Sequence, residues 1–228
     1  MLNHAIHIVN EKRNALQRLY NCRKNSCVPI SGRDVLLIMQ IAFFDDPERL
    51  TAQVNKLCDE LEKRIEEGVS VAEKNAPRIL ITGTPMAVPN WKMHNIVETS
   101  GGIVVCEENC TGTRYFTNTV KENNQTMEEA ASSLTERYFN NIHCACFTPN
   151  PERIDDILRL AKEYQVDGIL NVNLKFCNLY ATENYFVERR LKEEGYKVLS
   201  LETDYEDSDA EQLRTRVSAF LEMIEANK

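Results

Sequence analysis

The hydrophobic pattern changes at Pro77, and this change constrains the fold more than any other feature of the 228-residue chain. Before Pro77, apolar residues recur at helical spacing. After it, short apolar runs alternate with helical stretches. Strands separated by helices are typical of a parallel sheet with right-handed crossovers. The sequence therefore predicts an α/β fold: an open, doubly wound (flavodoxin- or Rossmann-like) parallel sheet of four to five strands, preceded by an all-helical segment.

The same pattern predicts two parts, a helical N-terminal segment over 1–75 and an α/β domain over 76–228. In the first part, Asp46 and Pro47 form a helix-start signal, and Gly68 ends the helix that follows. Strands are expected at 78–82, 103–106, 142–147, 168–172 and 197–201. Helices of the second part are expected near 90–100, 125–139, 151–164, 182–194 and 209–226.

Charge and hydropathy exclude several classes of protein. The formal net charge is -8 and the pI about 5.2, whereas a nucleic-acid partner requires a basic surface. No run of about 18 apolar residues is present, and the first residues do not read as a signal peptide. We therefore expect a cytoplasmic protein with no membrane and no nucleic-acid partner, whose cysteines are reduced or metal-bound.

Four of the eight cysteines fall at or just after predicted strand ends: Cys110, Cys144, Cys146 and Cys177. Ligands of open α/β sheets gather at those ends, and clustered thiolates there point to a soft metal or an iron–sulfur cluster. Two residues apart on a strand, Cys144 and Cys146 are expected to face the same side. Their C-x-C spacing is too tight for a zinc knuckle. The alternative is that all four are small buried hydrophobes.

The other cysteines have simpler interpretations. Cys58 lies beside the apolar stripe of a helix and is expected to pack there, and Cys106 is expected in a strand core. Cys22 and Cys27 flank a turn in C-x4-C spacing with no second ligand pair nearby. We interpret both as incidental.

Two loops are weak candidates for anion binding. TGTPMAVPN contains Gly83, Thr84 and Asn90, and Asn90 is expected to cap a helix whose backbone N–H groups could hold a phosphate or carboxylate. TGTR contributes Thr111 and Arg114. Neither loop is a G-x-G-x-x-G or a P-loop, so a plain strand–helix turn is the alternative.

Other polar residues of these loops are assigned structural roles first. His94 and His143 are expected to be structural rather than ligands. Glu107 and Glu108 are expected at a solvated loop end, with acid–base chemistry as the alternative.

Six separated motifs, in order along nearly the whole chain, carry a family resemblance. They are PISGRDVLLIMQIAFFDDPERLT, GTPMAVPNWK, ETSGGIVVCEENCTGTRYF, HCACFTPNPERID, LKFCNLYATENY and LETDYEDSDAEQLRTRVSAFLEMI. Together they resemble 2-hydroxyacyl-CoA dehydratase and benzoyl-CoA reductase subunits of the D-component type, in particular the double-cubane-cluster branch.

The resemblance implies an oxygen-sensitive iron–sulfur (4Fe–4S or double-cubane) enzyme that receives a low-potential electron from a separate ATP-hydrolysing activator protein. In the dehydratases, which are lyases, a ketyl radical then forms on the acyl-CoA and water is eliminated. In the double-cubane branch, two cubanes share a bridging sulfide and reduce small molecules.

Residue by residue, Cys177 in LKFCNLY resembles the C-terminal cluster cysteine of the family. Cys110 in EENCTG, and Cys144 or Cys146 in HCACFTPN, resemble the extra thiols of the double-cubane branch. Thr84 stands where that branch is expected to have a cysteine. Catalytic residues are not assigned.

Family subunits carry another α/β domain before the matching segment, and it supplies further cluster cysteines. The chain is therefore expected to be a piece of a longer protein, a half-protein that needs a partner, or a remnant without the cluster. Expected partners are the missing N-terminal domain or a partner subunit, the activator, and an acyl-CoA or other small-molecule substrate. Isolated in air, the chain is expected to lack an intact cluster and to self-associate through an exposed apolar surface. The alternative function is a non-catalytic flavodoxin-like module that binds a partner or an anion.

Overall fold

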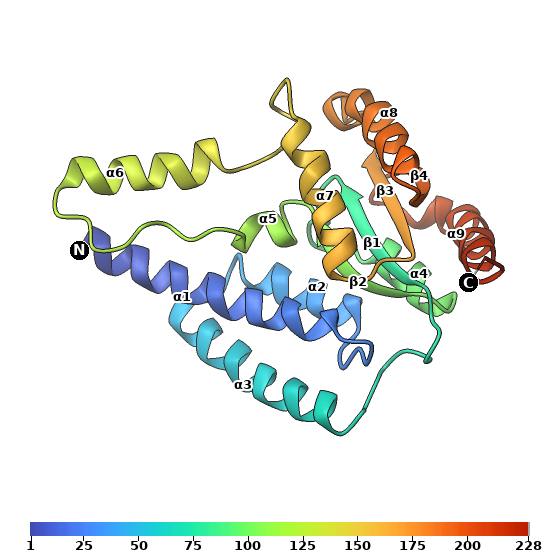
Figure 1. Cartoon of the computed structure of the whole chain (residues 1–228), viewed down its shortest axis with the longest axis horizontal. Helices are drawn as coiled ribbons and strands as arrows, with labels where there is room; N and C mark the ends of the chain where they lie inside the picture. The colour runs from blue at the N-terminus through green and yellow to red at the C-terminus, as the bar shows by residue number, and fades with distance from the viewer. Residues whose placement is uncertain (228) are drawn as a thin grey trace.

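The computed structural model describes residues 1–227 and confirms the α/β fold (Figure 1). Four strands form one sheet in the order β2-β1-β3-β4, with every neighbouring pair parallel. Their bounds are Arg78–Gly83 (β1), Ile103–Glu108 (β2), Gly168–Leu174 (β3) and Lys197–Thr203 (β4). Because β2 and β3 lie on opposite sides of β1, the chain direction across the sheet reverses between β1 and β3.

The predicted helical segment is present as α1 (Leu2–Asn21), α2 (Gly32–Ile41) and α3 (Pro47–Glu66), with a short turn η1 (Cys22–Lys24) after α1. The start signal predicted at Asp46 and Pro47 is confirmed, and α2 has a side-chain cap as well. The Ser31 side chain accepts a hydrogen bond from the backbone N–H of Asp34 and caps α2. Asp46 caps α3 in the same way, with Pro47 in its first turn.

Helices cover both faces of the sheet because side chains alternate along each strand. Leu80 and Ile169 face a core shared with α1, α3, α7 (Pro151–Glu163) and α8 (Asn178–Glu193). Ile79, Ile81 and Leu170 face a second core, closed by α4 (Lys92–Thr99) and α9 (Ala210–Glu225). The N-terminal helices thus share one hydrophobic core with the sheet.

One segment between β2 and α7 projects from the sheet (Figure 1). It contains the short α5 (Thr113–Phe116), then α6 (Met127–Thr135), which continues as a π-helical turn η2 (Glu136–Asn140). Ala130 of α6 and Val120 pack on Ile6, near the start of α1. The long connection is therefore anchored at its far end by a small satellite core.

The predicted strand at 142–147 is wrong. These residues form bends and turns before α7, and the backbone N–H of Phe147 donates to Cys144 C=O at 2.9 Å, which closes a turn. The run IHCACF has Ile142 as its only β-branched residue, so its strand propensity is weak. The remaining strands agree with the sequence prediction, and α8 begins at Asn178 rather than near 182.

The described part of the chain, residues 1–227, contains no helix long and apolar enough to cross a membrane.

Candidate functional site

Three loops bring the four selected thiols to the carboxyl-terminal edge of the sheet. Cys110 follows β2, Cys177 follows β3 and precedes α8 directly, and Cys144 and Cys146 lie in the turn before α7. These loops flank the point where the chain reverses between β1 and β3, which is where open α/β sheets bind ligands.

The thiols lie close enough to interact. The Sγ atoms of Cys144 and Cys146 are 3.8 Å apart, and all cysteines are free thiols. A hydrogen bond between Cys110 and Cys144 raises the pKa of Cys110 and lowers that of Cys144. The pKa of Cys146 is raised, mainly by its bond to Cys144 and in part by the charge of the nearby Cys177. Cys110, Cys144 and Cys146 are therefore coupled to one another, and Cys177 lies near Cys146, although Cys144 and Cys146 come from a turn instead of a strand.

Arg114 and Tyr180 lie between the thiols. The Arg114 guanidinium donates to Tyr180 Oη at 2.7 Å and lies 3.9 Å from Cys110 Sγ. Tyr180 Oη is in turn 3.9 Å from Cys144 Sγ. Both residues are almost fully buried, so their positions are fixed. They hold two thiols from different loops in one arrangement.

Glu108 anchors this arrangement from the end of β2. Its carboxylate pairs with Arg114, accepts a hydrogen bond from Thr82 Oγ1, and lies 3.4 Å from Arg153. Arg153 also pairs with Glu183 of α8. The predicted solvated loop end is wrong for Glu108, which is 1% exposed. The cations Arg114 and Arg153 need a negative counter-charge here. Glu108 can be buried because its carboxylate and these guanidinium groups neutralise one another.

Glu107 is also buried, at 1% exposure, so the solvated prediction is wrong for it too. Its carboxylate accepts from Arg23 at 2.9 Å and Tyr20 at 2.7 Å, and lies 3.0 Å from His94 Nε2. Burial would raise the pKa of Glu107, but the Arg23 charge and the His94 bond outweigh it and lower the pKa to about 2. Glu107 ties the helical segment to β2, and His94 has the structural role predicted for it.

A loss of stability in acid is expected from Glu107. Its folded pKa of about 2 is below its ordinary value of 4.5, so its contribution is complete above about pH 4.5 and is lost as the pH falls toward 2. That shift corresponds to roughly 3 kcal/mol of unfolding free energy. Urea unfolding of the wild type and of Glu107→Gln between pH 6 and 2 measures it. Parallel pH curves for the two proteins would contradict the assignment.

The residues suggested for anion binding have partners within the chain. Thr84 Oγ1 donates to Val172 C=O at 3.1 Å and accepts from the N–H of Leu174 at 3.0 Å. Thr111 Oγ1 accepts from the N–H of Met86 and donates to Asn109 Oδ1. Arg114 pairs with Glu108.

Asn90 does not cap α4, which begins at Lys92 with Trp91 before it and no side-chain cap. The backbone N–H of Asn90 instead donates to Ala87 C=O at 2.7 Å, in a turn that places its side chain in the interior. The capping prediction is therefore wrong, because no side chain caps α4. Gly83, the remaining candidate, adopts a φ of +118° at the end of β1.

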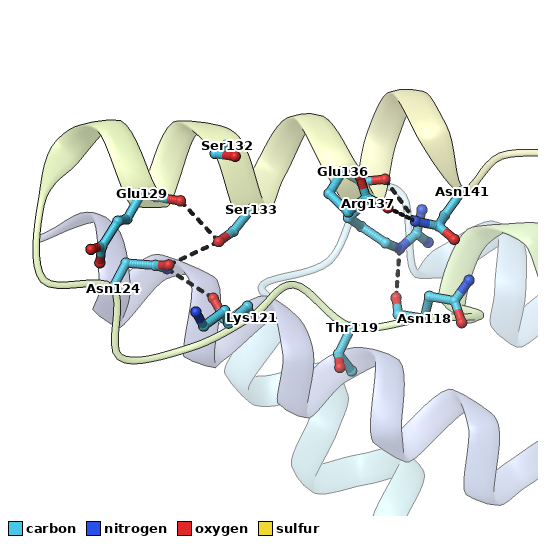
Figure 2. Close-up of a pocket in the computed structure, with 10 residues that line it drawn as sticks. All are labelled: Asn118, Thr119, Lys121, Asn124, Glu129, Ser132, Ser133, Glu136, Arg137 and Asn141. Atoms are coloured by element: carbon cyan, nitrogen blue, oxygen red, sulfur yellow. Dashed lines mark hydrogen bonds between the residues drawn. The ribbon is translucent and has the colours of Figure 1, made fainter.

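A polar pocket of about 580 Å³ lies elsewhere, between the α6–η2 segment and the chain at 118–124 (Figure 2). Figure 2 shows Arg137 donating to the carbonyl of Asn118, and Asn141 bonded to Glu136. Two cations, Lys121 and Arg137, are balanced by two carboxylates in its lining. None of the predicted site residues lines this pocket, so we do not assign the site to it.

A comparison with known proteins identifies the family of this chain. The model of the 2-hydroxyglutaryl-CoA dehydratase D-component matches residues 1–224. The chain belongs to this D-component family. It is 34% identical over 225 residues to the putative dehydratase subunit YjiM of Escherichia coli (strain K12), covering 98% of the chain and 57% of that protein. It is 24% identical over 187 residues to the (R)-phenyllactyl-CoA dehydratase beta subunit of Clostridium sporogenes, covering 82% and 47%. The chain thus spans about half the length of these curated relatives.

The thiols of this D-component family member suit an iron–sulfur cluster by their chemistry. Within residues 1–227, no group of three or more His, Cys, Asp or Glu side chains is arranged to hold a single metal ion. A multi-iron cluster differs, because its thiolates bind separate irons and need not converge on one point. Free thiols from three loops at one sheet edge are ligands of the type that such a cluster takes.

The sequence interpretation missed three residues of the network that Glu108 and the thiols share: Arg153, Tyr180 and Glu183. A signal for Arg153 was present. It lies in the first turn of α7, where the helix dipole disfavours a cation, so a carboxylate partner had to be near. Tyr180 and Glu183 carry no such signal, because only the docking of α8 on α7 brings Tyr180 Oη to 3.9 Å from Cys144 Sγ and pairs Glu183 with Arg153.

The remaining candidates have structural surroundings. Cys58 and Cys106 are fully buried, which confirms their predicted packing role. Cys22 is buried and hydrogen-bonds to Cys58, while Cys27 bonds to the carbonyl of Val69. His143 Nδ1 lies 2.7 Å from Asp156.

Proposed function

We propose that the chain is a component of an oxygen-sensitive iron–sulfur 2-hydroxyacyl-CoA dehydratase, or of a related low-potential reductase. In this proposal Cys110, Cys144, Cys146 and Cys177 bind the cluster. The observation that carries it is the gathering of four free thiols at the carboxyl edge of the sheet in a D-component family chain. The names of both relatives, a dehydratase subunit and a phenyllactyl-CoA dehydratase subunit, support the reaction class.

A bound cluster would supply one-electron chemistry at low potential. The chain's own residues provide its ligands and their surroundings. Arg114 and Tyr180 orient the thiols of Cys110 and Cys144, and their N–H and O–H groups lie close to the sulfurs. Hydrogen bonds to cluster sulfurs tune the reduction potential. These two residues are positioning residues in this proposal.

The remaining partners follow from the same proposal. Since the chain spans about half of its relatives, the rest of a longer polypeptide or a partner subunit completes the enzyme. An ATP-hydrolysing activator protein donates the electron, and an acyl-CoA is the substrate.

Iron binding tests the proposal. After anaerobic reconstitution with iron and sulfide, the wild-type chain is expected to retain iron and acid-labile sulfide through gel filtration. Cys177→Ser and Cys144→Ser are expected to lose retained iron by about tenfold or more, since each removes a direct ligand. Cys27→Ser is the matched control, because Cys27 bonds to Val69 away from the edge and should keep wild-type iron. Iron retention that does not depend on Cys177 would contradict the ligand assignment.

A non-catalytic module is the second candidate, and one observation favours it. Thr84 occupies a position where the family resemblance implies a cysteine, and both of its hydrogen bonds hold β1 against β3. A chain that stays iron-free and colourless under the same reconstitution would support this second function.

A further inference from the structure

A second pocket, different in character from that of Figure 2, lies beside the thiols. It has a volume of about 620 Å³ and is formed by the turn before α7, the first turns of α7 and the outer face of α8. Apolar side chains dominate its walls, among them Phe147, Ile154, Leu179 and Phe186. Its volume is within the range of small-molecule sites, which are mostly apolar with a few placed polar groups.

The pocket opens at the thiol edge. Ala145, between Cys144 and Cys146, is part of its lining, and so is Asn178, which follows Cys177 directly. No cysteine is among the residues described as lining the pocket, so a molecule that fills it lies beside the loops that carry Cys144, Cys146 and Cys177.

The charge inside the pocket is already neutralised. Its one charged lining residue is Glu183, whose carboxylate pairs with Arg153 and accepts a hydrogen bond from Asn150 at 3.0 Å. Asn150 uses the same amide to donate to Cys144 C=O at 2.8 Å. No Lys, Arg or His is among the residues described as lining this pocket. A carboxylate entering it would lose water without gaining a cation, which is unfavourable.

We propose that this pocket receives an uncharged, apolar acyl side group of the substrate, about the size of a phenyl ring or a branched alkyl chain. It disfavours acyl chains that end in a carboxylate. The inference rests on the proposed function for the thioester itself, and it adds the class of acyl group. The Asn150 amide and the Glu183 carboxylate already bind Cys144 C=O, Arg153 and each other, so selection depends on shape and on the absence of a cation.

Binding to the full chain without a cluster tests the inference. The probes are two N-acetylcysteamine thioesters with the same polar end, one 3-phenylpropanoyl and one glutaryl. Isothermal titration calorimetry and ligand-observed NMR at pH 7 measure both. The phenylpropanoyl thioester is expected to bind on the order of tenfold tighter or more, the discrimination typical of an apolar pocket.

A variant with a cation added to the pocket tests whether the missing positive charge determines the preference. Thr182 lines the pocket from the exposed surface of α8, so Thr182→Lys adds a cation without disturbing the core. It is expected to reduce the preference for phenylpropanoyl at least about fivefold. Ala181→Lys, on the same helix but outside the lining, is the matched control and should leave the preference unchanged. Thermal unfolding checks that both variants are folded.

Equal affinity for the two thioesters, or no binding of either at millimolar concentration, would overturn the inference. An identical response of Thr182→Lys and Ala181→Lys would overturn it as well, because it would show a non-specific charge effect. The iron test of the proposed function is separate. If an iron-free chain binds the phenylpropanoyl thioester selectively, the pocket inference stands and the proposed cluster is contradicted. If the chain retains iron but binds both thioesters equally, the proposed cluster stands and the pocket inference is contradicted.

Discussion

Replacing Glu107 by Gln is expected to lower the free energy of unfolding at pH 7 by about 3–5 kcal/mol, the typical cost of breaking a buried ion pair from one side. Glu107 is the carboxylate that compensates Arg23, and both side chains are almost fully shielded from water. Gln has nearly the same shape as Glu and keeps an oxygen that accepts from Tyr20. The loss of unfolding free energy therefore reports the removal of the negative charge. Urea unfolding followed by circular dichroism measures it.

Glu62→Gln is the matched control for this change. Glu62 also pairs with an arginine, Arg18, at 2.7 Å, but its side chain is 48% exposed. Solvent screens such a pair, and the expected loss is below about 1 kcal/mol. Similar losses for the two variants would mean that the Glu107 network contributes no more than a surface pair.

Gly83→Ala is expected to cost on the order of 3–5 kcal/mol of unfolding free energy, a size that single substitutions reach only through clash or strain in the interior. Gly83 has a φ of +118°, and a Cβ built there would lie 2.1 Å from the carbonyl oxygen of Val172. That carbonyl belongs to β3 and accepts from Thr84, so it cannot move away without breaking the sheet edge. Denaturant unfolding of the purified variant measures the loss.

Gly195→Ala is the control that separates the cost of the steric clash from the cost of the positive φ. Gly195 also has a positive φ, +87°, but an added Cβ meets nothing within 4 Å. Only the conformational cost of roughly 1–2 kcal/mol remains there. A Gly83→Ala loss no larger than that of Gly195→Ala would contradict the tight approach of β1 to β3.

Much of the fold could be predicted from local sequence. The β-branched runs at 78–82 and 168–172 identify buried strands because such residues pack well in a sheet. Ser31 and Asp46 mark helix starts because their oxygens accept from backbone N–H groups only a few residues away. Interactions of this kind lie within one turn of chain, so the sequence itself displays them.

The segment 142–147 shows where such reasoning fails. A short apolar run is ambiguous between a strand and a buried turn, and pairing with a neighbour is what decides. Here Phe147 bonds back to Cys144, and no strand pairs with the segment among residues 1–227. The thiols of Cys144 and Cys146 still reach the site, but through the geometry of a turn.

The sequence by itself determined the four strands of the sheet, the helical segment and the family resemblance, because these depend on residue type and spacing along the chain. Only the tertiary structure decided that Glu107 and Glu108 are buried, and that Arg114 and Tyr180 lie beside the thiols of Cys110 and Cys144. The partners in these networks are separated by up to 87 residues, as Tyr20 and Glu107 are. The energy of a charge depends on its burial and on its neighbours in space, and neither is a property of local sequence.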